Sequence, residues 1–510
     1  MAQRDMRGGN YSAELQAPEI YRDRRRRLAD RIGGGTIVLW GAGDDRGYGD
    51  VGTFRQSSTF YYFTGVELPN AVVVLRPTED LDALFLPPRN PNVERWTGPK
   101  FGPGEETAEA LDFGEVLSTA PTEIVLDARR RPVPGFEGRL QGWLSEEGAT
   151  LWTEYPAVGS SSVLPPTHRL VSRLRARTPS FEVGDLTDHV TALRLVKDEG
   201  EMDLMRKAVA ASVAGQRAAA RTISPGVGEC EVDGAVYAAF RRHGAEGLAF
   251  PSIVGCGYNA TTLHYDQNVG TCNDGELVVV DIGARYGYYC GDLTRTYPAN
   301  GRFNERQRAI YDLVLEAHDR VAEAIKPGIR IFDLRKIAYD VMQSSDLRDA
   351  SGEKLGQYFI HGLGHFLGLD AHDPGSEEAL LEPGNVITNE PGIYIPDEAL
   401  GVRIENDFLV TSTGSDNLSA LREAIRRWTS APADFTWTLI TGDTSQSRSN
   451  TQNEIWFEAG PGPAPAECKF KYLPWLRTMV TADIIFYDSY EDGSRTVTLN
   501  WDEISFYSEY

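Results

Sequence analysis

The chain has 510 residues, of which 41% are hydrophobic and 25% are charged, and these proportions are typical of a soluble globular protein. Because one hydrophobic core rarely organises so long a chain, the length predicts two or three domains. The formal charge of -23 at pH 7 disfavours binding to nucleic acid and to anionic membrane surfaces, since both are negatively charged.

The cysteines and the N-terminal residues bear on the cellular compartment. The five cysteines are odd in number and show no CxxC spacing, so they predict neither a disulfide framework nor a thiolate zinc site. The N-terminal residues lack the apolar stretch of a signal peptide, and no 18 apolar residues run together. We therefore expect a cytoplasmic protein without a membrane-bound part.

Residues 1–182 predict a smaller α/β domain, because short apolar runs alternate there with charged segments and Pro/Gly turns. The runs are Thr36 to Trp40, Asn70 to Leu75, Ala83 to Leu86 and Glu123 to Leu126. This part of the sequence contains no phosphate loop and no nucleophile motif.

Longer amphipathic helices are predicted from about residue 183 onward. Two apolar stripes have the 3.6-residue spacing of core helices: Met202, Met205, Val209 and Val213, and then Ile310, Leu313, Val314, Ala317, Val321 and Ile325. Each stripe is followed by a similar short sequence, Ile223 to Gly226 in the first case and Ile325 to Gly328 in the second. Residues 275–283 can also be aligned with residues 384–392, and in this alignment Asp281 matches Glu390. These repeats predict two similar halves that share one acidic centre.

An acidic hairpin is predicted between residues 278 and 296. If Tyr286 and Gly287 form a two-residue turn, Asp281 lies directly opposite Asp292 on the same face. Two such carboxylates have Cβ atoms about 5 Å apart and repel by roughly 3 kcal/mol at an effective dielectric near 20, so a positive ion is expected between them. For an isolated pair, one solvated carboxylate and one turn cap are an equally good explanation.

Three of the eight histidines, His361, His365 and His372, lie within twelve residues. The glycines at positions 362, 364 and 368 argue against a helix, so this is not the helical HExxH zinc site. A lone histidine is usually a hydrogen-bonded structural residue, but three with interleaved glycines predict a loop that approaches a ligand.

Two glutamates complete the candidate site. Glu390 follows the apolar run 386–388, and Glu405 shares the face of a predicted strand with Arg403, although each glutamate alone is more simply a surface residue. The candidate metal ligands are then four carboxylates and one imidazole: Asp281, Asp292, His365, Glu390 and Glu405. Such a hard, oxygen-rich set suits Mn²⁺ or Mg²⁺, and two ions about 3.5 to 4 Å apart can activate a bridging water, so the set predicts hydrolysis.

Residues 421–510 have a different composition, with five of the nine tryptophans of the chain. Alternating apolar residues at 435–439 and the turn signal Asp492-Gly493 predict a β-rich C-terminal extension. It contains no recognisable catalytic constellation.

The chain closely resembles the aminopeptidase P and prolidase family, the proline-specific metallopeptidases with the pita-bread fold. The matching segments are Thr262-Leu-His-Tyr265, Asp281-Ile-Gly283, Gly291 to Thr296, His361 to His365, Gly368 to Asp373, Asn389 to Gly392 and Gly401 to Glu405. Residues 53–65 and 94–98 also resemble the family's N-terminal domain. The resemblance implies an α/β N-terminal domain (1–182) and a pita-bread α+β catalytic domain (183–420) with pseudo-twofold halves, and the extension (421–510) departs from the family's usual length.

The resemblance also implies roles for the candidate ligands. Asp281 would chelate one metal ion, Asp292 and Glu405 would bridge two ions, and His365 and Glu390 would complete the other site. Glu390 would in addition act as the proton shuttle. Two divalent ions are implied, and we expect Mn²⁺, with Co²⁺, Zn²⁺ or Mg²⁺ as alternatives.

Four further residues are implied to act around the metal ions. His264, His361 and His372 would line the pocket and stabilise the tetrahedral intermediate, and Arg403 would support the metal carboxylates.

The activity implied by the resemblance is that of an Xaa-Pro aminopeptidase, which removes the N-terminal residue from peptides with proline in second position. The bond before proline is a tertiary amide without an N–H, so it needs a pocket built for that ring. An Xaa-Pro dipeptidase (prolidase) and a catalytically silent peptide-binding scaffold are the alternatives. Proline-containing peptides and a homo-oligomer, dimer or tetramer, are the expected partners.

Overall fold

The computed structural model describes residues 16–43, 54–120, 136–158 and 165–419, together with short strands between residues 456 and 507. The chain divides into two compact units, Met1–Leu421 and Arg422–Tyr510.

A six-stranded mixed sheet organises the N-terminal part of the first unit, in the order β4-β3-β2-β1-β5-β6. Strands β1, β2 and β3 form an antiparallel meander, and β4, β5 and β6 add to it in parallel. The strands are β1 (Thr36–Trp40), β2 (Val72–Arg76), β3 (Leu81–Leu86), β4 (Glu115–Ser118), β5 (Thr150–Thr153) and β6 (Glu182–Asp185). The accompanying helices are α1 (Pro18–Ile32), α2 (Ser58–Thr64), α3 (Pro91–Thr97), α4 (Glu105–Leu111), α5 (Phe136–Leu144), α6 (Pro166–Arg175) and α7 (Thr187–Leu195).

This sheet confirms the α/β prediction for the N-terminal part. The apolar runs that begin at residues 36, 70 and 83 correspond to β1, β2 and β3. The run predicted at 123–126 lies outside the described residues.

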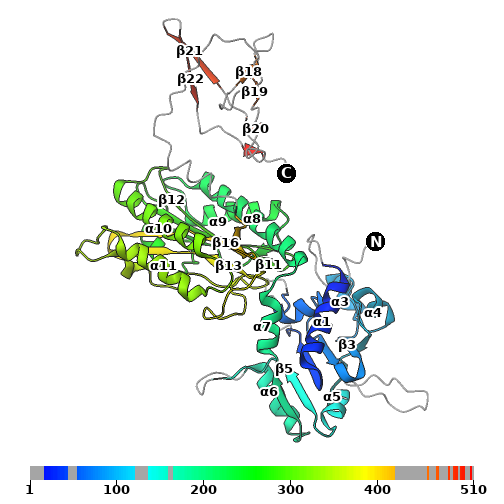
Figure 1. The fold of residues 1–510 in the computed structure, drawn as a ribbon. Helices are drawn as coiled ribbons and strands as arrows, with labels where there is room; N and C mark the ends of the chain where they lie inside the picture. Colours follow the sequence, from blue (N-terminus) through cyan, green and yellow to red (C-terminus); the bar gives the residue numbers. More distant parts are fainter. Residues whose placement is uncertain are drawn as a thin grey trace, which may run out of the picture. The chain divides into compact units, whose positions relative to one another are not determined.

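Two pairs of long helices follow, and Figure 1 shows them beside the strands that they cover. They are α8 (Glu199–Thr222), α9 (Glu229–Arg242), α10 (Glu305–Ala324) and α11 (Ile331–Ser344). Capping boxes fix the starts of α8 and α10, with Asp198 and Glu201 at the first and Asn304 and Gln307 at the second. Both predicted apolar stripes are buried on these helices, which confirms them as core.

Short antiparallel sheets lie between the helix pairs. Strand β9 pairs with β8 and β12, β16 pairs with β13 and β17, and β14 pairs with β15. The strands are β7 (Gly247–Leu248), β8 (Ile253–Cys256), β9 (Leu277–Ile282), β10 (Ala284–Tyr286), β11 (Tyr289–Cys290), β12 (Leu293–Pro298), β13 (Val386–Asn389), β14 (Gly392–Ile395), β15 (Leu400–Arg403), β16 (Asn406–Val410) and β17 (Ser415–Asn417). Single 3₁₀ turns occupy Pro77–Glu79, Gly257–Thr261, Leu355–Tyr358 and Pro396–Glu398.

The predicted register of the acidic hairpin is wrong by two residues. Strand residue Asp281 pairs with Thr294 and not with Asp292, because the turn is formed by Gly287 and Tyr288. Both turn residues have positive φ, 56° and 76°, as a two-residue hairpin turn requires. The buried carboxylate of Glu246 accepts hydrogen bonds from both turn N–H groups and so selects this turn.

In the second unit the structure describes three pairs of short antiparallel strands. They are β18 (Trp456–Glu458) with β19 (Glu467–Lys469), β20 (Thr481–Ala482) with β23 (Phe506–Tyr507), and β21 (Phe486–Glu491) with β22 (Ser494–Leu499). Glu491 pairs with Ser494, so β21 and β22 form the hairpin predicted around residues 492 and 493. The alternation predicted at 435–439 lies outside the described residues.

Two further features concern the cysteines and the helices. Cys256 and Cys272 form a disulfide with Cα atoms 5.2 Å apart, which the cysteine count did not predict. Cys256 ends β8, and Cys272 lies five residues before β9, the strand that pairs with β8, a relationship that spacing along the sequence does not reveal. Among the described residues, no helix combines the length and the apolar character needed to cross a membrane.

Candidate metal centre

The five predicted ligands come from separate elements between β9 and β16. Asp281 is near the end of β9, Asp292 directly precedes β12, His365 lies in the loop before β13, Glu390 follows β13, and Glu405 lies between β15 and β16. Asp281 and Asp292 still lie on the same face of the hairpin, because a register shift of two residues does not change the face to which a strand residue points. Asp281, Asp292 and Glu405 are buried, with exposed fractions of 8%, 4% and 1%.

Three of these side chains meet closely. Asp292, His365 and Glu405 each present one ligand atom, and these atoms lie within 4.8 Å of one another. Glu390 lies beside the same group, since Nε2 of His365 is 3.4 Å from Glu390 Oε1 and 3.6 Å from Asp292 Oδ2. This is the spacing of donors around an ion. Thr294 donates a hydrogen bond to Glu405, and Thr388 donates one to Glu390.

The imidazole of His365 has the protonation state that a metal ligand needs. Burial lowers its pKa to about 4, so the ring is neutral at pH 7. Nδ1 lies 3.1 Å from the carbonyl oxygen of Phe366, which can only accept a hydrogen bond. The proton is therefore on Nδ1, and the lone pair of Nε2 points towards the carboxylates.

The carboxylates of the cluster shift one another's pKa values because they are buried close together. Burial, and then the neighbouring carboxylates, raise the pKa values of Asp292 and Glu405 well above their usual range. Burial also raises the pKa of Glu390 to about 8, with Arg403 opposing the shift and Asp281 adding to it.

Two buried carboxylate oxygens, Asp281 Oδ1 and Asp292 Oδ1, have no hydrogen-bond partner among the described residues. Unpaired buried carboxylate oxygens are costly unless a cation or donor faces them. The donor set, the neutral imidazole and the unpaired oxygens therefore fit hard divalent ions.

Arg403 links the acidic cluster to a tyrosine and a histidine. Its Nη2 donates to Asp281 Oδ2 at 2.5 Å and its Nη1 to the hydroxyl of Tyr394 at 2.9 Å. The same hydroxyl is 3.0 Å from Nε2 of His361. Burial lowers the pKa of His361 to about 3, and the charge of Arg403 contributes, so this imidazole is also neutral.

His372 contacts the cluster through His365. Its ring stacks on that of His365 at a centroid distance of 4.0 Å. The next residue, Asp373, is held by Arg194 at 2.5 Å and by Lys197 at 3.0 Å. This buried ion pair fixes the loop that presents His372.

The remaining predicted histidine, His264, lies in the segment between β8 and β9. The carbonyl of its neighbour Leu263 accepts a hydrogen bond from Arg403 Nη2 at 3.4 Å. Burial is the main cause that lowers the pKa of His372, and the charge of His264 is the second. The segment that carries His264 is therefore bonded to Arg403 of the cluster through Leu263.

Sequence reasoning missed two residues of the site. Tyr394 joins Arg403 to His361, and Asp407 accepts a hydrogen bond from the backbone N–H of Asp292 at 3.0 Å. Asp407 follows Glu405 by two residues, so the strand alternation that selected Arg403 and Glu405 also includes it. Tyr394 carries no such signal, because its position depends on the pairing of β14 with β15.

Comparisons with known proteins agree with this geometry. Residues 203–412 match the model of metallopeptidase family M24, and residues 21–130 match that of the aminopeptidase P N-terminal domain. The chain is 33% identical to the Xaa-Pro aminopeptidase of Haemophilus influenzae, over 80% of this chain and 96% of that protein, and 32% identical to that of Escherichia coli, with the same coverage. A solved structure of Escherichia coli aminopeptidase P with the inhibitor Pro-Leu is 29% identical and superposes with a TM-score of 0.70, over 82% of this chain and 99% of that one. The chain belongs to the aminopeptidase P family of M24 metallopeptidases.

Proposed function

We propose that the protein is an Xaa-Pro aminopeptidase, which hydrolyses the first peptide bond of peptides with proline in second position. The observation that carries the proposal is the buried cluster of carboxylates and one neutral imidazole, with two carboxylate oxygens left without partners among the described residues. The relatives named Xaa-Pro aminopeptidase, matched over nearly their whole length, support the same activity.

The metal ligands in this proposal are the five residues expected from the sequence. Asp281 would help to hold one ion, His365 and Glu390 would help to hold the other, and Asp292 and Glu405 would be shared by both. Two divalent ions, for which we propose Mn²⁺, would supply an activated water and polarise the scissile carbonyl.

The protein's own residues then position the substrate and move a proton. Glu390 takes the proton of the attacking water and passes it to the leaving proline nitrogen, as a general acid–base group. His264, His361 and His372 line the pocket and hydrogen-bond the oxygen that becomes negative. Arg403 holds Asp281 in place through the hydrogen bond from its Nη2 to Oδ2 of the carboxylate.

A comparison of peptides tests this activity and separates it from the alternatives. The enzyme should release the first residue of an Xaa-Pro-Yaa tripeptide and leave the matched Xaa-Ala-Yaa peptide uncut. Cleavage of the Xaa-Pro dipeptide alone would indicate a prolidase. If none of these peptides were cut while metal was bound, a peptide-binding scaffold would be the better description.

We also propose an organisation and a setting for the enzyme. The N-terminal domain comprises residues 1–182, the catalytic domain with its two similar halves residues 183–420, and the β-rich extension residues 421–510. A homo-oligomer and a cytoplasmic location are part of this proposal. The Cys256–Cys272 disulfide is unusual for a reducing compartment, so alkylation of the thiols in freshly lysed cells is the direct test of location.

A further inference from the structure

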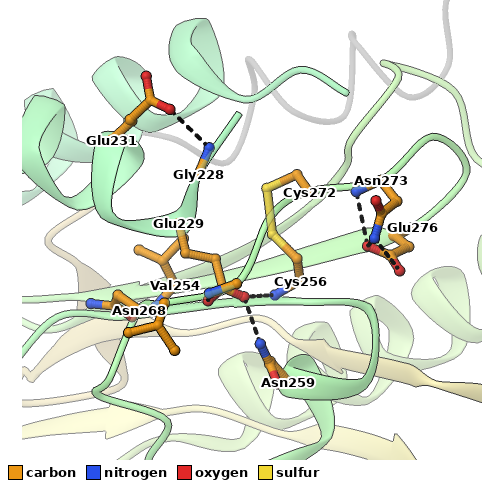
Figure 2. Close-up of a disulfide and its surroundings, with 12 residues drawn as sticks. Gly228, Glu229, Glu231, Val254, Cys256, Asn259, Asn268, Cys272, Asn273 and Glu276 are labelled. Atoms are coloured by element: carbon orange, nitrogen blue, oxygen red, sulfur yellow. Dashed lines mark hydrogen bonds between the residues drawn. A yellow bond between two sulfur atoms is a disulfide. The ribbon is translucent and has the colours of Figure 1, made fainter. Parts of the chain in front are cut away.

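Glu229, in the first turn of α9, is fully buried and lies beneath the segment that connects β8 to β9. Figure 2 shows its carboxylate pointing towards this segment, next to the Cys256–Cys272 disulfide. A buried carboxylate needs several donors to remain ionised. All of its donors come from the one segment, residues 256–270.

The carboxylate of Glu229 accepts four hydrogen bonds. Oε1 accepts from the backbone N–H of Cys256 at 2.8 Å and from Nδ2 of Asn259 at 2.9 Å. Oε2 accepts from the hydroxyl of Tyr265 at 2.8 Å and from the backbone N–H of Gly270 at 2.6 Å. Both oxygens are thus occupied, which makes Glu229 a clamp on the segment and leaves it no capacity for a ligand.

The fit around Gly270 is too close for any other residue. A Cβ atom at this position would lie 2.8 Å from Cδ of Glu229. The backbone adds a further bond, from the N–H of Glu229 to the carbonyl of Gly270 at 3.0 Å. The helix start and the segment therefore bind each other through both side chain and main chain.

The two ends of the segment are also fastened. The disulfide joins Cys256 to Cys272 across a sequence separation of 16. Cys272 in addition exchanges backbone hydrogen bonds with the turn before α9, from its N–H to the carbonyl of Val227 at 2.8 Å and to its carbonyl from the N–H of Gly226 at 2.7 Å. With its ends fixed, the shape of the segment depends on what holds its middle.

The middle of the segment carries His264. Its neighbour Tyr265 is bonded to Glu229, and its other neighbour Leu263 accepts a hydrogen bond from Arg403, which in turn holds Asp281. The two neighbours of His264 are thus hydrogen-bonded on one side to Glu229 of α9 and on the other to Arg403 of the acidic cluster.

We propose that Glu229 is a positioning residue that holds the 256–270 segment so that His264 faces the scissile bond, an inference that rests on the proposed peptidase activity. It touches neither substrate nor metal, and it acts through the position of His264. Loss of the clamp lets the segment move, and a misplaced pocket group costs catalysis even when the group itself is present.

The test is a double-mutant cycle with Glu229→Gln and His264→Ala. The glutamine amide keeps the size of the side chain but places an NH₂ group against two donors, whichever way it turns. We expect Glu229→Gln to lower kcat/KM for an Xaa-Pro-Yaa peptide about 10- to 100-fold with the metal content unchanged. In the His264→Ala background the same substitution should have almost no further effect, because residues that act as one unit are not additive.

Two variants control for the fold. Glu231→Gln alters an exposed carboxylate of the same helix turn, bonded to the N–H of Gly228 at 3.1 Å, and should behave as the wild type. Tyr265→Phe removes one hydroxyl donor to Glu229. It replaces Glu229→Gln in the double-mutant cycle if that variant does not fold. The proposal would be overturned if the double variant lost kcat/KM by the product of the two single-variant factors. It would also be overturned if the His264→Ala enzyme had wild-type kinetics.

Hydrogen exchange separates this inference from the proposed activity. In Glu229→Gln and in Tyr265→Phe, amides of residues 257–271 should exchange faster, while those of residues 386–410 should not change. Unchanged exchange in the 257–271 segment would contradict the clamp even in a fully active enzyme. Faster exchange in a protein without any peptidase activity would retain the clamp and reject the proposed function.

Discussion

Arg403 donates to one carboxylate oxygen of Asp281, and the other oxygen of that carboxylate has no partner among the described residues. The guanidinium therefore fixes one oxygen of Asp281, and the other oxygen is available to a cation. Outer partners of this kind typically contribute 10- to 100-fold to metal affinity.

We expect Arg403→Met to weaken metal binding by roughly 10- to 100-fold, because it removes the charge and both donors and leaves Asp281 buried without its counter-ion. Calorimetric titration of the metal-free variant with Mn²⁺ measures the effect. Tyr394→Phe is the matched control, since it removes one hydrogen bond of Arg403 and leaves the contact with Asp281. Equal losses in the two variants would contradict the assigned role.

Glu390→Gln should abolish turnover and leave the fold intact. The amide is isosteric but cannot take the proton of the attacking water, and general acid–base groups contribute about 10²- to 10⁴-fold. Thermal unfolding and kcat for an Xaa-Pro-Yaa peptide, both measured with saturating Mn²⁺, check the two halves of this prediction. Turnover at the wild-type rate would remove Glu390 from the mechanism.

The metal-free enzyme should become less stable as the pH rises from about 5 to about 8. Burial raises the pKa of Glu390 to about 8 in the folded state, above its ordinary value of 4.5. A carboxyl whose folded pKa is raised stabilises the fold below its unfolded pKa, and this contribution is lost as the pH rises through the folded pKa. Asp292 and Glu405 shift in the same direction for the same reason.

Unfolding temperatures of metal-free and Mn²⁺-loaded protein at pH 5, 6, 7 and 8 test this dependence. Metal should stabilise most at the highest pH, because its ligands bind in their ionised forms. In the Glu390→Gln variant, the unfolding temperature of the metal-free protein should depend less on pH. A metal-free protein that gained stability over this range would show that its carboxylates are already compensated by other groups.

Removal of the C-terminal extension should leave the metal centre unchanged. Residues up to Ser419 are packed in the catalytic domain, where Leu418 lies against Val209 and Leu293 and Ser419 is buried. A chain that ends at Ser419 should bind Mn²⁺ as the full chain does, and should differ in oligomeric state or in KM for long peptides. If both were the same as in the full chain, the extension would have no role in assembly or access.

The sequence predicted which side chains lie close together better than it predicted the register of the strands that carry them. Asp292, His365 and Glu405, whose ligand atoms meet in the structure, were selected from an acidic hairpin, a glycine-rich histidine segment and strand alternation. The hairpin register was missed, since the turn is selected by Glu246, 41 residues before Gly287. Local patterns do not report partners that are distant in the sequence, and the roles of Tyr394 and Glu229 were missed for the same reason.

The measurement that tests the central claim most directly is a joint titration of metal and activity. Metal-stripped protein should cleave no Xaa-Pro-Yaa peptide, and cleavage should appear as Mn²⁺ is added and reach its maximum at two ions per chain. Asp292→Asn should lose both the stoichiometry and the cleavage. The account would be contradicted if protein that retains no metal cleaved the peptide fully, or if protein with two bound ions did not cleave it.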